Sequence, residues 1–247
     1  MLDRFVYTAM TGAKHAMGQL GNTSHNLANA QTPGFREMVS MFRGVPIQGV
    51  SADSRSFVVD STPGSNFTPG PVSTTGHPLD VAIRERGFFV LQRPDGSEGY
   101  SRSGKFVLDQ DGNLRGPGGT RVMGVDGPIA TDLEAADIQI QQDGRILARL
   151  PGDFEATLVG RLKLVNPAPH TLVREGDGLF TAPSGLEEPS EEVRVQQGAL
   201  ESSNVNVAAA MVEMIKQNRL FDLNLRMVQV AEQNAKTAGS LMSLSRV

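Results

Sequence analysis

The C-terminal stretch of the chain, residues 207–244, has the sequence VAAAMVEMIKQNRLFDLNLRMVQVAEQNAKTAGSLMSL, with no proline and a single glycine. At a rise of 1.5 Å per residue, a helix over this range would be ~57 Å long. A surface helix of a monomer needs only one apolar stripe, about 100° wide. This stretch has two, and therefore predicts a helix that packs on two sides. The first consists of Met211, Met214, Phe221, Leu225, Val228, Ala235 and Met242, and the second of Leu220, Leu223, Met227, Val230, Leu241 and Leu244.

The N-terminal segment also has helical periodicity. Its apolar positions alternate by four and three residues, which is the heptad spacing of helices that pack along a seam. A helix over residues 2–27 would be ~39 Å long. The middle of the seam is made of alanines, so a partner helix could approach closely there. The seam positions are Leu2, Val6, Ala9, Ala13, Ala16, Leu20, Thr23 and Leu27.

The distribution of proline separates these ends from the middle of the chain. All 14 prolines lie between Pro33 and Pro189, and proline destabilises a helix interior by ~3 kcal/mol. We therefore predict an α+β fold, in which an antiparallel, coiled-coil-like pair of N- and C-terminal helices forms a split domain. A central antiparallel β domain is inserted between its halves. The expected segments are a helix in 1–32, an extended Pro/Gly-rich connection in 33–75, the β domain in 76–198 and a helix in 199–247.

Residues 76–198 contain short apolar runs separated by turn residues, as in small antiparallel β domains. Asp143-Gly144 predicts the turn of a hairpin between residues 138–140 and 146–148. Residues 158–165 predict a further strand, and Val193–Val195 the last strand before the C-terminal helix. Asp109–Asn113 partly resembles a calcium-binding loop, but the acidic ligand expected near its end is missing, so a hairpin turn is the preferred interpretation.

The search for catalytic and cofactor-binding groups favours a protein that is not an enzyme and has no cofactor. The chain of 247 residues has no cysteine, which excludes disulfides and thiol chemistry. Its four histidines lack metal-binding spacing, and there is no nucleophile elbow or phosphate-binding loop. A net charge of −4 argues against a nucleic-acid partner. Charged residues interrupt both terminal segments, so we expect no membrane insertion, and no cleaved signal peptide is visible.

Three stretches together resemble the bacterial flagellar rod and hook proteins. The first is HNLANAQTPGFR at residues 25–36, the family's N-terminal signature. The second is PLDVAI at 78–83 with GFFV at 87–90 and Tyr100–Arg102, and the third is VQQGALESSNVN at 195–206. Residues 160–165 and 175–180 are more like the proximal-rod F-type subunit than the distal-rod G-type. The resemblance implies a structural subunit of the rod, exported through the flagellar type III apparatus, whose helices line a tube in the periplasmic space.

The expected partners are therefore further copies of this chain, other flagellar rod proteins and the export apparatus. The distal-rod type is kept as an alternative, together with an adhesin-like or carbohydrate-binding module on a helical stalk. From the heptad positions and the resemblance, we predict subunit-interface residues in both terminal segments. They are Leu2, Val6, Ala9, Ala13, Leu20, Asn26, Asn29, Thr32, Pro33, Gly34 and Phe35 in the first, and Met211, Met214, Phe221, Leu225, Val228 and Met242 in the second.

The signature residues also have a local interpretation. Pro33 disfavours a helical conformation at Thr32, and Gly34 permits a sharp turn, so this triplet is expected to end the first helix. The amides of Asn26 and Asn29 could satisfy backbone groups at the helix end or contact a neighbouring subunit, and the sequence leaves both roles open.

Overall fold

The computed structural model describes residues 2–46, 56–131, 137–150, 152, 155–183 and 185–244. The chain divides into two compact units. The first, here called the helical unit, comprises Met1–Ala28, Met38–Gly64 and Asn206–Val247. The second, the β unit, comprises Asn29–Glu37 and Ser65–Val205.

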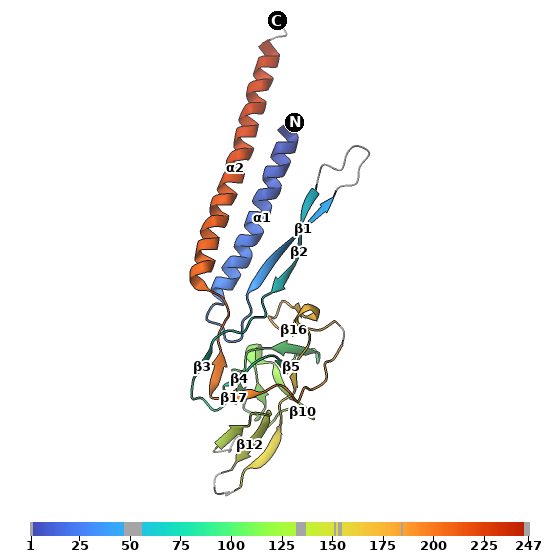
Figure 1. Ribbon diagram of the computed structural model, residues 1–247, viewed down its shortest axis with the longest axis vertical. Coiled ribbons are helices and arrows are strands. Elements are labelled where there is room, and N and C mark those ends of the chain that lie inside the picture. The colour runs from blue at the N-terminus through green and yellow to red at the C-terminus, as the bar shows by residue number, and fades with distance from the viewer. Residues whose placement is uncertain are drawn as a thin grey trace. The chain divides into compact units, whose positions relative to one another are not determined.

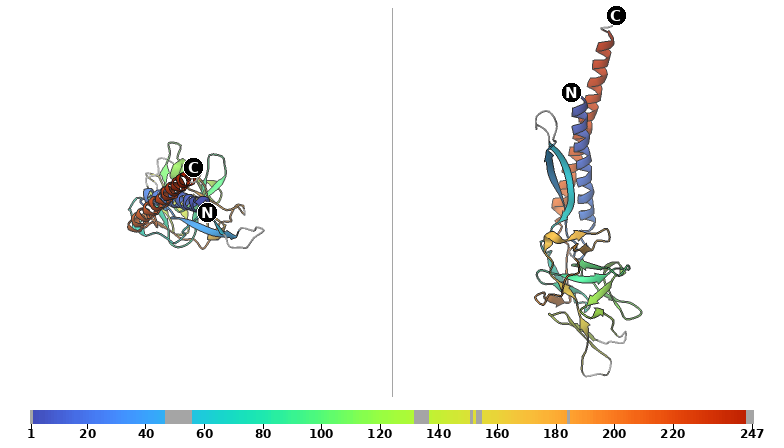
Figure 2. Two further views of the ribbon diagram at one scale, coloured as in Figure 1. Left: turned by 90° about the horizontal axis from the view of Figure 1, so that it is seen from above. Right: turned by 90° about the vertical axis from the view of Figure 1, so that its right-hand side faces the viewer.

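The helical unit is built on the two predicted helices, α1 (Leu2–Ala28) and α2 (Val207–Leu244). They lie side by side and antiparallel, with the N- and C-terminal ends of the chain at the same end of the pair (Figures 1 and 2). Asn206 caps α2, since its Oδ1 accepts a hydrogen bond from the Ala209 amide at 3.1 Å. The N- and C-terminal helices of the predicted α+β fold are thus confirmed, while the coiled-coil geometry of their pairing stays a prediction.

The segment expected to be an extended Pro/Gly-rich connection contains paired strands. Within residues 33–75, β1 (Met38–Pro46) pairs with β2 (Ser56–Ser65) in the helical unit, and β3 (Val72–Thr74) pairs with β18 in the β unit. The backbone is extended at these strands, and their pairing is what the sequence did not predict. Their partners stabilise them: the Asn26 amide binds the backbone of Met38 at the start of β1, and the Phe42 ring packs edge-on against His15 at 5.5 Å.

The β unit is antiparallel throughout its described strand pairs, as the sequence predicted. Its largest sheet has the order β15-β16-β6-β5-β9-β8-β7, with β10 on β9 and β14 on β5; β11-β12-β13 form a second sheet, and β17-β4 and β18-β3 are separate pairs. The strands are β4 (Val81–Ile83), β5 (Phe88–Gln92), β6 (Glu98–Ser101), β7 (Val107–Leu108), β8 (Leu114–Arg115), β9 (Arg121–Gly124), β10 (Gly127–Pro128), β11 (Asp137–Ile140), β12 (Arg145–Arg149), β13 (Thr157–Arg161), β14 (Leu164–Val165), β15 (Val173–Arg174), β16 (Phe180–Thr181), β17 (Val195–Gln197) and β18 (Ala199–Glu201).

Both predicted hairpins are present. Ile140 pairs with Ile146 across the Asp143-Gly144 turn, and Val107 pairs with Arg115 across the turn at Asp109–Asn113. In the second hairpin, Asp109 Oδ1 accepts hydrogen bonds from the amides of Asp111 and Asn113, which fixes the turn.

The strand predicted over residues 158–165 is two strands. β13 belongs to the three-stranded sheet, whereas β14 pairs with β5 in the largest sheet, and the chain changes sheet at Leu162 and Lys163. The alternation of Leu162 and Leu164 with polar residues predicted one continuous strand. Both leucines are buried in the same core cluster although the chain changes sheet between them. That cluster, which includes Val81, Phe89 and Val122, fills the space between the sheets and explains why a strand pair as short as β14–β5 is stable.

Candidate assembly site

The seam between the two helices is lined by small residues on α1. Ala9, Ala13 and Ala16 are buried, as the heptad pattern predicted. On α2, the buried side chains are Gln217, Asn224 and Ala231. The helices approach closely at Gly12, where an added Cβ atom would lie 2.6 Å from Oδ1 of Asn224. The small residues of α1 therefore allow backbone approach, and a polar side chain of α2 occupies the space they leave.

Two of the seam residues on α2 are polar, and the sequence analysis did not identify them. Gln217 and Asn224 lie one heptad apart between Met214, Phe221 and Val228, which are half-buried. Asn224 Nδ2 donates to the carbonyl of Leu220 at 2.8 Å, and Gln217 Nε2 donates to Oε1 of Glu213 at 2.6 Å. A heptad pattern that allows polar residues would have identified them, because positions 214, 217, 221, 224, 228 and 231 alternate by three and four residues without a break.

The second apolar stripe of α2 is left exposed by α1. Leu220, Leu223, Met227 and Val230 follow each other by three, four and three residues, so they share one side of the helix. All four are exposed, Leu223 at 54% and Val230 at 57%. On α1, Tyr7, Met10 and Met17 are exposed as well. Clustered apolar side chains of this kind mark interaction surfaces. We call Leu220, Leu223, Met227 and Val230 the outer stripe.

The predicted interface residues of the helices are divided between these two surfaces. Val6, Leu20, Met214, Phe221 and Val228 are half-buried, and Met211 and Leu225 are exposed. Ala9 and Ala13 lie in the seam. Leu2 and Met242 lie in α1 and α2, but their side chains lie outside the described residues.

The N-terminal signature is divided between the two units. Asn26 belongs to the helical unit, where its amide both donates to the carbonyl of Met38 and accepts from the Met38 amide, each at 2.8 Å. Its side chain thus binds the first residue of β1 as a partner strand would. Asn29 begins the β unit. Its Oδ1 accepts a hydrogen bond from the Thr32 hydroxyl, and its backbone carbonyl accepts one from the Thr32 amide. Both side chains thus have hydrogen-bond partners within this chain, and a role of either amide at a subunit interface stays a prediction.

Gly34 and Phe35 are buried in the β unit rather than presented on its surface. Gly34 has a φ of 70°, and an added Cβ atom would lie 2.3 Å from the amide nitrogen of Ser103. Both its conformation and its contact therefore require glycine. The guanidinium of Arg174 lies 4.3 Å from the centre of the Phe35 ring. Pro33 is half-buried and Thr32 is exposed.

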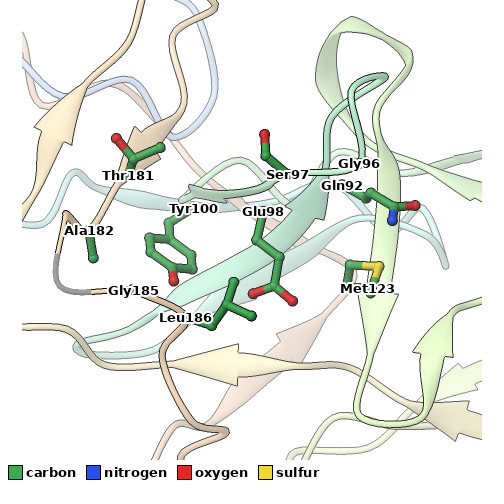
Figure 3. A pocket seen from close by; sticks show the side chains of 10 residues that line it. All are labelled: Gln92, Gly96, Ser97, Glu98, Tyr100, Met123, Thr181, Ala182, Gly185 and Leu186. Atoms are coloured by element: carbon green, nitrogen blue, oxygen red, sulfur yellow. The ribbon is translucent and has the colours of Figure 1, made fainter.

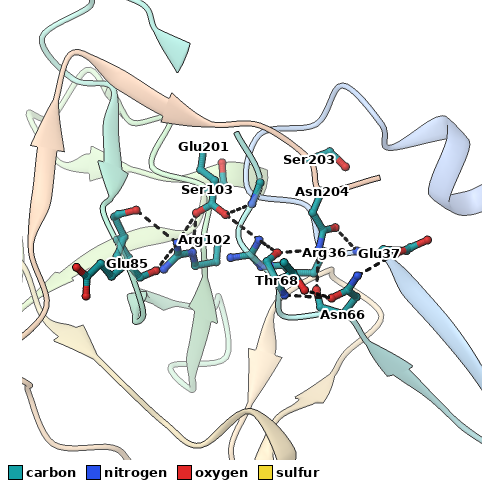
Figure 4. A network of polar contacts seen from close by, with 12 residues as sticks. Arg36, Glu37, Asn66, Thr68, Glu85, Arg102, Ser103, Glu201, Ser203 and Asn204 are labelled. Carbon is teal, nitrogen blue, oxygen red and sulfur yellow. Dashed lines mark hydrogen bonds and ion pairs between the residues drawn. The ribbon is translucent and has the colours of Figure 1, made fainter. Parts of the chain in front are cut away.

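A buried carboxylate joins the N-terminal and C-terminal signatures within the β unit (Figure 4). Glu201 on β18 forms ion pairs with Arg36 at 2.7 Å and with Arg102 at 2.5 Å. The Glu201 side chain is fully buried, and both arginine side chains are only 2% exposed. Burial lowers the pKa of Arg36 and of Arg102, and the charge of Glu201 opposes this in each case. The sequence analysis named neither Glu201 nor Arg102 as a site residue, because nothing local distinguishes them.

A pocket of about 340 Å³ in the β unit has no arrangement of catalytic groups among its lining residues (Figure 3). Its ionisable side chains are those of Glu98 and Tyr100. Glu98 is paired with Lys163 at 2.8 Å, and the Tyr100 hydroxyl accepts a hydrogen bond from the Glu187 amide. Burial raises the pKa of Tyr100, so its hydroxyl stays protonated. Neither group is placed for acid–base chemistry.

The described residues contain neither a metal-binding cluster nor a membrane-spanning helix. Across residues 2–46, 56–131, 137–150, 152, 155–183 and 185–244, no three His, Cys, Asp or Glu side chains gather where they could hold a metal ion. Within the same ranges, neither helix combines the length and the apolar character that crossing a membrane requires.

Comparison with known proteins gives consistent matches over nearly the whole chain. The family models for the flagellar hook protein FlgE/F/G D1 domain and the flagellar basal body rod FlgEFG protein C-terminal region match residues 82–148 and 196–241. The flagellar basal-body rod protein FlgF of Escherichia coli is 41% identical, over 99% of this chain and 100% of that protein. FlgF of Salmonella typhimurium is 40% identical over the same shares. The rod protein FlgG of Buchnera aphidicola is 28% identical, over 92% of this chain and 95% of its own length.

Proposed function

Since the chain belongs to the flagellar basal-body rod protein family and is 40–41% identical to two F-type members, we propose that its copies assemble through their helical units into the proximal part of the rod. The chain is a structural subunit of the flagellar basal-body rod. We further propose that the assembled helices form the wall of a tube, surround the export channel and transmit torque. Two F-type relatives, at 40–41% identity, exceed the 26–29% of the G-type relatives, although other F-type relatives are 24–29% identical; the two high values favour the proximal over the distal type.

The observation that supports assembly through the helices is the outer stripe. Leu220, Leu223, Met227 and Val230 form a continuous apolar surface on α2 that α1 leaves exposed. Burial of apolar surface is the main driving force of protein association. Burial of the outer stripe between copies would contribute ~25 cal/mol of association free energy per Å² of apolar surface removed from water. The adhesin-like alternative is not favoured, because the relatives are rod proteins.

The test is a charge in the outer stripe. We expect Leu223→Asp to leave the isolated chain folded, because residue 223 is exposed there, and to abolish incorporation into basal bodies, because a carboxylate would be buried without a partner. Asn218→Asp introduces the same charge at an exposed position outside the stripe and serves as control. Basal bodies are isolated from cells in which the variant is the sole copy, and the subunit is quantified. Normal incorporation of Leu223→Asp would refute assembly through this surface.

We further propose that the chain reaches the rod through the flagellar type III export apparatus, without cleavage of a signal peptide, and functions in the periplasmic space. The N-terminal segment supports this proposal, because it forms α1, whose alanines pack in the helix seam and would be lost with a cleaved leader. Mass spectrometry of the subunit recovered from basal bodies should find α1 intact. A processed form that lacks residues of α1 would contradict the proposal.

A further inference from the structure

The chain passes between the two units four times, after residues 28, 37, 64 and 205. On the side of the β unit, three segments contain all of these passages: residues 29–37, 65–71 and 201–205. Side chains of these segments meet in one polar network, which lies wholly within the β unit (Figure 4). Any force that reaches the β unit through the backbone of the helical unit must enter by one of these segments.

Glu201 forms one centre of the network. Its Oε1 accepts hydrogen bonds from Nη1 of Arg36 at 2.7 Å and from the amide of Gly70 at 2.9 Å, which joins the first and second segments to the third. Its backbone carbonyl accepts from the amide of Gly34 at 2.7 Å. Its Oε2 accepts from Arg102, which in turn donates to the carbonyls of Gly87 and Glu85 in the turn between β4 and β5.

Asn204 forms the other centre and uses its whole amide group. Oδ1 accepts from the amide of Glu37 at 2.7 Å, while Nδ2 donates to the carbonyls of Asn66 at 2.8 Å and Thr68 at 2.9 Å. The backbone amide of Asn204 donates to the carbonyl of Phe35 at 3.3 Å. One half-buried side chain therefore ties the third segment to both of the others at the points where the chain leaves the β unit.

A requirement for stability alone would not concentrate these bonds at the passages, because the β unit already has an extensive apolar core. A buried carboxylate with two arginines is costly to desolvate, and an apolar cluster can stabilise a fold equally well. Hydrogen bonds and ion pairs, however, are directional, and they fix the position of a backbone segment along several axes at once.

We propose that the network centred on Glu201 and Asn204 is a mechanical anchor, which fixes the connecting segments to the β unit so that load on the helical unit is transmitted without peeling these segments away. Asn204 and Glu201 are positioning residues in this role. The proposal rests on the proposed rod function. It predicts that weakening the anchor affects rotation under load, while assembly and rotation without load remain normal.

The test variant is Asn204→Ala, which removes three side-chain hydrogen bonds and leaves the buried ion pairs of Glu201 in place. Asn113→Ala is the matched control: Asn113 is also half-buried in the β unit, but its side chain binds Asp109 in the β7–β8 hairpin, away from the passages. In the isolated full-length chain, hydrogen exchange of the Glu37 amide should accelerate at least tenfold in Asn204→Ala and remain unchanged in Asn113→Ala. Exchange of the Leu114 amide, which binds the carbonyl of Ile129, reports on the remainder of the β unit and should not change in Asn204→Ala.

The cellular test measures flagellar rotation in media of increasing viscosity, with each variant as the sole copy of the subunit. We expect normal rotation at low viscosity and a premature loss of rotation at high viscosity for Asn204→Ala only. Equal load dependence of the two variants would overturn the proposal, as would failure of Asn204→Ala to incorporate. If the two variants show equal load dependence but both incorporate normally, the anchor is refuted while the proposed rod function still stands. Failure of the unaltered chain to restore rotation in a strain that lacks the subunit would instead refute the proposed function itself.

Discussion

Replacement of Gly34 by alanine should destabilise the β unit strongly, for two reasons that can be measured separately. Its φ of 70° lies in the left-handed region, where a side chain costs about 1–2 kcal/mol. An added Cβ atom would also lie 2.3 Å from the amide nitrogen of Ser103 and 2.4 Å from the carbonyl carbon of Arg102. Both are backbone atoms, so they cannot rotate away.

Relief of this clash requires the segment to move by about 1 Å, since ordinary carbon contacts begin near 3.4 Å. Such a movement would break the 2.7 Å hydrogen bond from the Gly34 amide to the Glu201 carbonyl, worth about 1 kcal/mol, and would disturb the neighbouring Arg36–Glu201 pair. Overpacking typically adds ~1–3 kcal/mol. We therefore expect a total loss of about 3–6 kcal/mol in the free energy of unfolding of the β unit.

Gly118→Ala is the matched control, because Gly118 has a φ of 66° and an added Cβ atom would contact nothing within 4 Å. It should lose only the conformational term, about 1 kcal/mol. For a unit of this size, 1 kcal/mol corresponds to roughly 2–4 °C in Tm. Gly34→Ala should therefore lower the Tm by about 6–24 °C and Gly118→Ala by about 2–4 °C.

Near-ultraviolet circular dichroism can assign the transition to the β unit. The chain has two tyrosines and no tryptophan; Tyr100 is buried in the β unit, whereas Tyr7 is 58% exposed on α1. A probe specific to one unit is needed because a chain of two units need not unfold in one step. If Gly34→Ala and Gly118→Ala melt within 2 °C of each other, the close approach of Gly34 to residues 102 and 103 is not a determinant of stability.

Two further predictions concern the helix seam and the pH dependence. Gly12→Ala should destabilise the helical unit by about 1–2 kcal/mol, because the new methyl group meets Asn224 Oδ1 at 2.6 Å. In an Asn224→Ala background the same substitution should instead stabilise α1 by up to ~1 kcal/mol. Thermal unfolding followed by far-ultraviolet circular dichroism measures both effects, and an effect of the same sign in both backgrounds would refute the packing at Gly12. Burial opposes ionisation of Asp109, but hydrogen bonds from Arg115 and from the Asn113 and Asp111 amides prevail and lower the pKa of its carboxyl to about 2. Because this value is below the ordinary value of 3.8, the carboxylate stabilises the fold fully above pH ~4, and the contribution is lost as the pH falls towards 2. Asp109→Asn should remove this part of the acid dependence of unfolding, and identical acid profiles for the variant and the unaltered chain would contradict it.

The sequence predicted where helices, strands and turns lie better than it predicted which strands pair with each other. The range 207–244 for the C-terminal helix, the hairpin at Asp143-Gly144 and the turn at Asp109–Asn113 depend on neighbouring residues, and all are found. The pairing of strands within 33–75 was not predicted, and the single strand over 158–165 was wrong. In both cases the outcome depends on a distant partner: β3 pairs with β18, and β14 pairs with β5.

The candidate site shows the same division. Alanines at heptad spacing predicted the seam on α1, but Gln217 and Asn224 were missed because a polar residue in an apolar stripe gives no signal without its partner helix. Arg36 was part of a recognised motif, yet its role is set by Glu201, which lies 165 positions further along the chain. No local pattern predicts that a particular glutamate will be fully buried between two arginines.

The sequence by itself determined the helical ends, the turn-rich middle and the two signatures, because the periodicity of apolar residues and the placement of proline act over a few residues. The tertiary structure alone decided that the outer stripe of α2 stays exposed beside α1, that Gly34 lies against the backbone at Ser103, and that Glu201 and Asn204 hold the connecting segments. These features arise from contacts between residues far apart in the chain, such as Glu37 and Asn204. Such contacts form only when the long loops between them close, and the entropy of that closure is repaid by the completed fold rather than by any local segment.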